Sequence, residues 1–199
     1  MTVAAPLRWS ADLALATRCV GGDRSAQRDL YEQEKRRVHG TLYRIFGSNR
    51  QIDDVIQEVF IQVFRSLHNF RGESSLTTWI DRCTVRAAFA HLARGKKHRP
   101  ALALVDDLAA DDPSVERRAL AREGTRRFYS ALDDLDAKQR IAFTLYELEG
   151  YSLAEVAERM EATLVATKAR VFRARSRIEA AARKDPVLAG FIGGEGEEG

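Results

Sequence analysis

The stretch YSLAEVAERMEATLVATKARVFRARSRIE, residues 151–179, contains two helical patterns with a short turn between them. Ser152 followed by Glu155 is the spacing of a capping box, which begins a helix. The turn at residues 161–163 then leads into a longer basic segment, for which Thr163 is a suitable N-cap. A short helix, a tight turn and a longer basic helix are typical of a helix-turn-helix, whose second helix lies in the DNA major groove.

The charge of this second helix is strongly one-sided. Residues 162–177 contain five basic side chains and no acidic one. A helix that is only solvated usually alternates acids and bases at i,i+4, so the asymmetry favours an anionic partner. On this segment alone, a basic helix that is merely solvated remains the alternative.

A helical wheel divides residues 164–182 into two sides. The apolar side is expected to be buried, and it consists of Leu164, Thr167, Val171, Ala174, Ile178 and Ala182. The opposite side has small alanines at its centre and cations at its margins, which suits approach to base edges and phosphates. Its candidate DNA contacts are Val165, Ala166, Lys168, Ala169, Arg170, Phe172, Arg173, Ser176 and Arg177.

The rest of the chain also predicts helices, because apolar residues recur at steps of three and four and strand alternation is absent. We expect an all-α protein, with Ser10 as the N-cap of its first helix and Gly47 ending its second. An apolar stripe at Ile52, Val55, Ile56, Val59, Val63 and Leu67 predicts an amphipathic helix. The expected helices cover residues 10–20, 24–46, 52–67, 75–97, 114–132, 136–149, 152–160 and 164–184.

The distribution of charge predicts two helical domains. Residues 101–115 contain four aspartates and no basic residue, and Pro100 ends the helix before them. We therefore expect domains at residues 8–98 and 116–184, joined by an acidic linker at 99–115. The C-terminal residues 185–199 are expected to be a disordered tail, because they end in GGEGEEG.

Composition excludes several classes of protein. The chain has 199 residues and a net charge of +3, and no apolar run approaches the length of a membrane span. We expect a soluble cytoplasmic protein without a secretory signal. Cys19 and Cys83 form no CxxC pair and are expected to be buried thiols, and the four histidines are scattered, so no metal site is predicted. No phosphate-binding glycine loop or catalytic motif is present, so neither a cofactor nor enzyme activity is expected.

Two segments resemble the bacterial RNA polymerase sigma factors of the extracytoplasmic-function (ECF) group. LDAKQRIAFTLYELEGYSLAEVAERM, followed by TKARVFRARSRIE, resembles region 4 of the sigma-70 family. DDVIQEVFIQVFRSLHNFRGESSLTTWIDRCTVRAAFAHLAR resembles region 2. The resemblance implies a transcription initiation factor that binds core RNA polymerase and promoter DNA, with the minus-thirty-five element bound by the basic helix. Members of the group are commonly held inactive by an anti-sigma factor.

The resemblance also assigns roles within the N-terminal domain. The core polymerase-binding role falls on Asp54, Gln57, Glu58 and Ile61; on spacing alone, a solvated acidic face is an equal alternative. Residues 82–99 contain six basic side chains and no acid, which favours phosphate contact, and the resemblance implies binding and opening of the minus-ten element. The residues assigned to this element are Arg71, Ser74, Ser75, Arg82, Arg86, Arg94, Lys96 and Lys97. Trp79 is expected to pack in the core, with base stacking as the alternative.

The sequence departs from the family pattern at several positions. Glu161 occupies a turn position where glycine is common, and a left-handed backbone there would cost about 1 kcal/mol. Residues 165–167 replace the usual Gly-Thr-Val, while Arg86 and Ala90 stand where asparagine and aspartate are frequent. The aspartates of the linker are either solubilising charges or a nucleic-acid-like strand that passes along the polymerase.

Two other classes of function stay open from the sequence. The chain could be a helix-turn-helix regulator that acts by occupying DNA without polymerase. It could also be a helical interaction or RNA-binding module, for which binding would be salt-sensitive and blind to sequence.

Overall fold

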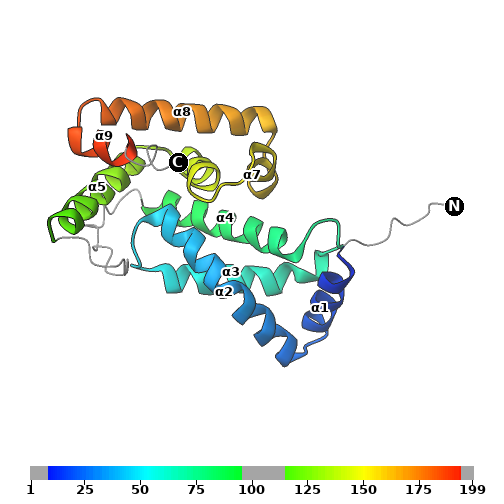
Figure 1. Cartoon of the computed structure of the whole chain (residues 1–199). Helices are drawn as coiled ribbons and strands as arrows, with labels where there is room; N and C mark the ends of the chain where they lie inside the picture. The colour runs from blue at the N-terminus through cyan, green and yellow to red at the C-terminus, as the bar shows by residue number, and fades with distance from the viewer. Residues whose placement is uncertain (1–8, 96–114, 194–199) are drawn as a thin grey trace.

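The computed structural model describes residues 9–95 and 115–193, and this part of the chain forms helices without any strand (Figure 1). The N-terminal group comprises α1 (Ser10–Val20), α2 (Arg24–Phe46), α3 (Ile52–Ser66), the 3-10 turn η1 (Leu67–Asn69) and α4 (Leu76–Gly95). The C-terminal group comprises α5 (Val115–Asp133), α6 (Ala137–Phe143), the π-helix η2 (Thr144–Leu148), α7 (Leu153–Arg159), α8 (Leu164–Ala182) and α9 (Pro186–Gly193). The prediction of an all-α fold is confirmed.

The N-terminal group packs around α3, whose predicted apolar stripe is buried. Each of the six stripe residues is at most 2% exposed. Helices α2 and α4 pack against α3, and Tyr31 of α2 meets Phe60 edge to face, with 4.6 Å between ring centroids. Cys19 and Cys83 are free and buried as predicted, and burial raises the pKa of both thiols.

Helix ends in this group follow local capping chemistry. Asp23 caps α2, and the hydrogen bond from the Ala26 backbone, together with those from Arg18 and Ser25, lowers the pKa of Asp23 to about 2. Gly47 ends α2 with a left-handed φ of 76°, as predicted. The prediction of Ser10 as an N-cap is wrong: Ser10 is the first helical residue, and Trp9 before it makes no side-chain cap.

The helix-turn-helix forms as its capping residues predict. Ser152 and Glu155 make both hydrogen bonds of the capping box at the start of α7. Thr163 accepts a 3.2 Å hydrogen bond from the backbone of Ala166 at the start of α8. Glu161 lies in the turn with φ of 49°, which is the left-handed backbone expected at that position.

Two parts of the C-terminal group differ from the prediction. The helix expected at 136–149 is α-helical only to Phe143 and continues as the π-helix η2. Residues 185–199 were expected to be disordered, but Pro186–Gly193 form α9, and Leu188 is only 2% exposed. Because Gly124 of α5 has no Cβ, the ring of Phe191 can lie directly against its backbone. The linker aspartates, Lys96 and Lys97 lie outside the described residues.

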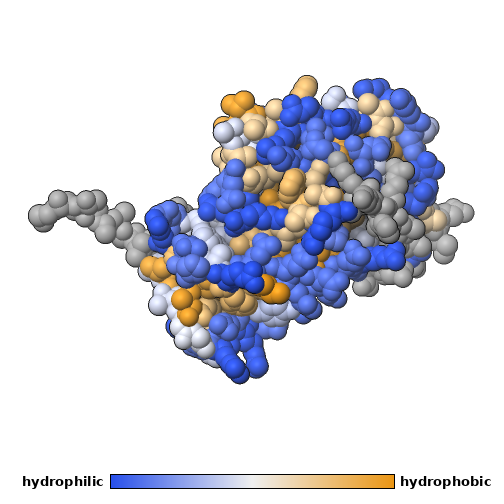
Figure 2. Space-filling model, turned by 180° about the vertical axis from the view of Figure 1, so that it is seen from behind, coloured by the Kyte–Doolittle hydropathy of each residue, from blue (hydrophilic) through white to orange (hydrophobic). Residues whose placement is uncertain are grey.

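The two groups of helices pack against each other rather than standing apart. α6 and α7 contact α4, and η2 contacts α2. Ile141, Leu145 and Val156 belong to the same apolar core as Ile45 and Ile80. In Figure 1 the C-terminal helices lie along one side of α4, with α8 outermost. From behind, hydrophilic side chains cover most of the surface, and apolar ones gather in separate patches (Figure 2).

Candidate nucleic-acid interface

Helix α8 turns one face to the protein and the other to solvent. Five of its six predicted core residues are buried, from Thr167 to Ala182. Leu164 was also placed in the core and this is wrong: it is 44% exposed and is the first residue of α8. On the opposite face Val165 is 78% and Phe172 is 72% exposed. Of the other candidate DNA contacts, Lys168, Arg173, Ser176 and Arg177 are exposed, and Ala166, Ala169 and Arg170 are partly exposed.

The cations of α8 fall into two sets. Arg175 donates a 2.5 Å hydrogen bond to Glu147, and this bond raises the pKa of the guanidinium. Arg177 donates to the carbonyl of Asp134 at 3.2 Å. These contacts fix α8 on the helices beneath it. By contrast, no acid within the described residues forms an ion pair with Lys168, Arg170 or Arg173, which leaves these three charges available to an anion.

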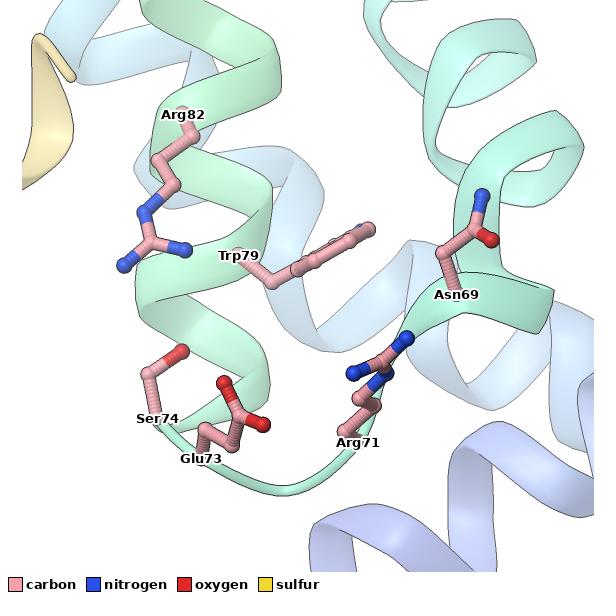
Figure 3. A pocket seen from close by; sticks show the side chains of 6 residues that line it. All are labelled: Asn69, Arg71, Glu73, Ser74, Trp79 and Arg82. Carbon is pink, nitrogen blue, oxygen red and sulfur yellow. The ribbon is translucent and has the colours of Figure 1, made fainter.

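A second site lies in the loop between η1 and α4. A cavity of about 220 Å³ is lined by Asn69, Arg71, Glu73, Ser74, Trp79 and Arg82 (Figure 3). Trp79 and Arg82 come from α4, while Asn69 and Arg71 face them from the other side of the loop. Arg71, Ser74 and Arg82 were predicted, and the structure brings them together. Asn69 and Glu73 were missed, because no sequence pattern gives the curvature of this loop.

Trp79 packs against the core, as predicted, and one side of it also borders the cavity. Its ring meets Phe70 edge to face, with 5.7 Å between centroids, and it packs against the N-terminal core. The same side chain lines the cavity. The indole N–H is buried, and within the described residues it has no hydrogen-bond acceptor. Trp79 therefore forms an apolar wall of the cavity.

Ser75 does not line this cavity. Its hydroxyl accepts a 3.0 Å hydrogen bond from the backbone of Thr78 and lies 2.9 Å from the Thr78 hydroxyl. Asp12 of α1 accepts a hydrogen bond from the backbone of Leu76 at 2.7 Å. Both residues satisfy backbone groups at the start of α4, so the structure gives Ser75 a capping role.

Three cations assigned to the minus-ten element, Arg82, Arg86 and Arg94, form hydrogen bonds within the protein. Arg82 donates to Glu158 of α7 at 3.0 Å. Arg86 is exposed, and its Nε lies 3.3 Å from the carbonyl of Arg82. Arg94 does not reach the cavity, because it pairs with Glu58 of α3 at 2.9 Å.

A groove between α3 and α4 contains two of the four predicted polymerase-binding residues, Glu58 and Ile61. The groove has a volume of about 460 Å³ and is lined by Glu58, Ile61, Gln62, Arg65, Ala90 and Arg94. Ile61 is 56% exposed, and Asp54 and Gln57 are exposed on the same helix. A single exposed apolar side chain is common on protein surfaces, so the candidate site rests on the groove together with Ile61 and not on the exposure of Ile61 alone. Gln62 and Arg65 also line the groove and were not among the predicted residues, although both lie on the polar side of the predicted helix.

Comparisons with known proteins place both groups of helices in one family. Residues 30–98 match the family model described as Sigma-70 region 2, and residues 125–178 match that of Sigma-70, region 4. The chain is 34% identical over 177 residues to the ECF RNA polymerase sigma-E factor of Haemophilus influenzae, covering 84% of this chain and 93% of that protein. The chain belongs to the ECF group of the sigma-70 family. This sigma factor is also 31% identical to the RNA polymerase sigma-H factor of Pseudomonas aeruginosa, covering 85% and 93% of the two chains.

Solved structures share the fold of this sigma factor. The structure of CnrH in complex with the cytosolic domain of CnrY matches with a TM-score of 0.61 and 22% identity, covering 88% of this chain and 99% of that one. The sigma factor RpoE of Bartonella quintana, solved with the anti-sigma factor NepR, matches with a TM-score of 0.57 and 18% identity, covering 79% and 99%. Helix α9 lies beyond the residues matched to region 4.

The described part of the chain was also compared with the patterns of a metal site and of a membrane-spanning helix. Within residues 9–95 and 115–193, no three His, Cys, Asp or Glu side chains are grouped so that they could hold a metal ion. None of the helices described has the length and apolar character needed to cross a membrane.

Proposed function

We propose that this ECF sigma factor binds core RNA polymerase, directs it to specific promoters and aids opening of the DNA strands. The observation that carries the proposal is the presence of both sigma-70 regions in one chain, each with an exposed site on it. In this proposal residues 8–98 bind core polymerase and the minus-ten element, 99–115 connect the domains, and 116–184 bind the minus-thirty-five element.

The outward face of α8 is suited to the major groove. Ala166 and Ala169 keep the centre of this face small, so the helix backbone can approach base edges closely. Lys168, Arg170 and Arg173 can reach phosphates without first leaving an ion pair, which favours a strongly salt-dependent affinity. The exposed ring of Phe172 offers an apolar contact of the kind that thymine methyl groups make.

The loop cavity is suited to an unpaired base of the minus-ten element. An extruded base needs an apolar wall and polar groups that meet its edge, while its strand needs cations. Trp79 supplies the wall, Asn69 and Ser74 supply hydrogen-bonding groups, and Arg71 and Arg82 supply charge. Ser75 supports the site indirectly, through the start of α4.

The groove between α3 and α4 is proposed as the docking surface for core polymerase. Ile61 would supply the apolar contact, and Asp54, Gln57 and Glu58 the polar contacts around it. Arg94 belongs with this surface by position, which moves it from the minus-ten set to the polymerase-binding set.

Catalysis is assigned to the polymerase, and this chain contributes binding and promoter choice without a cofactor. Such a role is exerted in the cytoplasm, where polymerase and promoter DNA are found. An anti-sigma factor is proposed as a further partner, since RpoE was solved in complex with the anti-sigma factor NepR, and CnrH was likewise solved with a second protein, the cytosolic domain of CnrY.

Run-off transcription with purified core polymerase tests the proposal. We expect start sites that depend on the protein, and a Glu58→Ala variant that binds core polymerase several-fold more weakly. Glu32→Ala, at an exposed acid on α2, is the matched control and should bind as the wild type does. Unchanged start sites and yield with and without the protein would show that the proposal is wrong.

A helix-turn-helix regulator acting without polymerase is the competing function. It would protect promoter DNA from nuclease as strongly alone as in the presence of core polymerase. We expect protection of both promoter elements only when core polymerase is added.

A further inference from the structure

Val165 is the most exposed of the large apolar side chains that the described residues present to solvent. It is 78% exposed, and Leu164 beside it is 44% exposed. Both belong to the first turn of α8, which begins at Leu164 after the Thr163 cap. The side chain of Val165 belongs to neither apolar core of the described residues, so folding of this part of the chain does not explain a valine there.

The first turn of α8 offers no free hydrogen-bonding side chain to a ligand. Residues 164–166 are leucine, valine and alanine, and the Thr163 hydroxyl before them accepts a 3.2 Å hydrogen bond from the backbone of Ala166. Thr167, the next residue, is completely buried. The first long polar side chain of α8 is that of Lys168. At this end of the helix, the side chains can therefore read a base only through apolar contact.

The chemistry of the major groove gives such a contact one natural target. In a helix-turn-helix, the N-terminal residues of the second helix contact base edges. Of the four bases, only thymine presents a methyl group in the major groove. Valine is branched at Cβ and holds one strongly preferred rotamer in a helix, so Val165 loses little freedom when it binds. It is therefore a rigid apolar group of suitable size to meet a thymine methyl group.

Val165 lies in line with Phe172 on the outward face of α8. Residues 165 and 172 are seven positions apart, which is about two helical turns and about 10.5 Å along the helix axis. Ala169 lies between them and is small, so the helix can approach the base edges closely. Base pairs follow one another at about 3.4 Å. The two side chains would therefore meet positions about three base pairs apart if α8 lies along the groove.

Val165 is also a departure of this chain from the family pattern. Residue 165 lies where glycine is usual, and glycine has no side chain with which to reach a base. Ala166 replaces the usual threonine, so the same turn has an apolar group more and a hydroxyl group fewer than the pattern. The first turn of α8 therefore carries an apolar contact that the usual pattern does not supply.

We infer that Val165 is a specificity-determining residue for the minus-thirty-five element, and that it selects a thymine through the C5-methyl group. The inference rests on the proposed function, because it needs α8 in the major groove. Lys168 and Arg173 are exposed on either side of the outward face, where they can bind phosphates and leave the base contact to Val165. Burial of one methyl-sized group changes affinity by about fourfold. The preferred element therefore carries a thymine about three base pairs from the position that Phe172 contacts.

Selection of promoter duplexes by the full chain with core polymerase tests the inference. A library randomised in the minus-thirty-five region gives the preferred element. Each thymine of that element is then replaced singly by uracil, which lacks only the methyl group. For the wild type we expect one such replacement, at the Val165 position, to weaken binding about fourfold. Val165→Ala should bind the thymine duplex about fourfold more weakly and should lose nothing further from this uracil, while uracil at other positions affects it as it affects the wild type.

Leu120→Ala is the matched control, because it truncates another exposed apolar side chain, on α5, and it should keep every uracil effect of the wild type. Circular dichroism should show both variants folded, since neither side chain is buried. If no uracil effect of the wild type disappears in Val165→Ala, the inference is overturned, and Val165 contacts a phosphate, a sugar or a protein instead. If the selection enriches no sequence at all, the proposed function fails together with the inference, so the two failures are distinguishable.

Discussion

Tyr129 of α5 lies directly against Gly47, the residue that ends α2, so that any Cβ at position 47 would overlap the tyrosine ring. The tyrosine hydroxyl lies 3.4 Å from the carbonyl of Arg44, which it can reach as a donor. The left-handed residue that ends α2 of one domain is thus also in contact with α5 of the other.

This contact predicts that Gly47→Ala is more harmful than an ordinary glycine substitution. A left-handed alanine costs about 1 kcal/mol, and overpacking against Tyr129 adds about 1–3 kcal/mol. Gly22 is the matched control, because its φ is 84° and no atom lies within 4 Å of a Cβ placed there. Urea unfolding of both variants separates the two costs, and equal losses of stability would show that Tyr129 does not press on position 47.

Tyr129 also predicts a loss of stability in alkali. Burial, reinforced by Tyr43 and opposed by Arg140 and Arg44, raises the pKa of Tyr129 to about 12 from its usual value of 10.0. The folded state therefore favours the neutral phenol: its contribution is full below pH 10 and is lost as the pH rises from about 10 to 12. Tyr129→Phe removes this titration, so the unfolding free energies of variant and wild type should converge across that range.

Ser74 and Ser75 are neighbours with separable roles. Ser75→Ala removes the cap of α4 and should lower the unfolding free energy by about 1 kcal/mol. Ser74→Ala should leave stability unchanged and weaken binding of a single-stranded minus-ten oligonucleotide, because Ser74 lines the cavity. Chemical denaturation and fluorescence anisotropy measure the two effects, and a loss of stability in the Ser74 variant would contradict this division.

On α8, Arg173 and Arg175 should differ in their effect on DNA affinity. Arg173→Ala should weaken promoter binding and reduce the slope of log affinity against log salt by about 0.9, the value for one phosphate contact. Arg175 is held by Glu147, so Arg175→Ala should leave that slope nearly unchanged. Equal slopes for both variants would place Arg173 away from the phosphates.

Local sequence predicted the helices and the orientation of α8, because caps and apolar periodicity act over a few residues. The capping box at Ser152 and the stripe on α3 are examples. The ion pair between Asp81 and Arg159 could not be predicted from the sequence. The two residues are 78 positions apart, and a charged residue is usually expected on the surface. Leu164 was misplaced because a helical wheel gives the direction of a side chain but not whether the end of the helix is covered; Leu164 is the first residue of α8.

The sequence at the start of α9 contains a helix-start pattern, but the composition of the residues after it led to a prediction of disorder. Asp185 accepts hydrogen bonds from the backbones of Val187 and Leu188, and Pro186 occupies the first helical position. An aspartate followed by proline is a recognisable helix start. The glycines and glutamates beyond residue 193 led instead to a prediction of disorder for the whole of 185–199.

The apolar core that includes Ile45, Ile141 and Val156 does not stop at the boundary between the two sigma regions. Both domains of the free protein should consequently unfold in one cooperative transition. Differential scanning calorimetry should show this as a single peak. A half that is produced alone would keep only its own share of that core. It should therefore unfold at a lower temperature than the whole chain does.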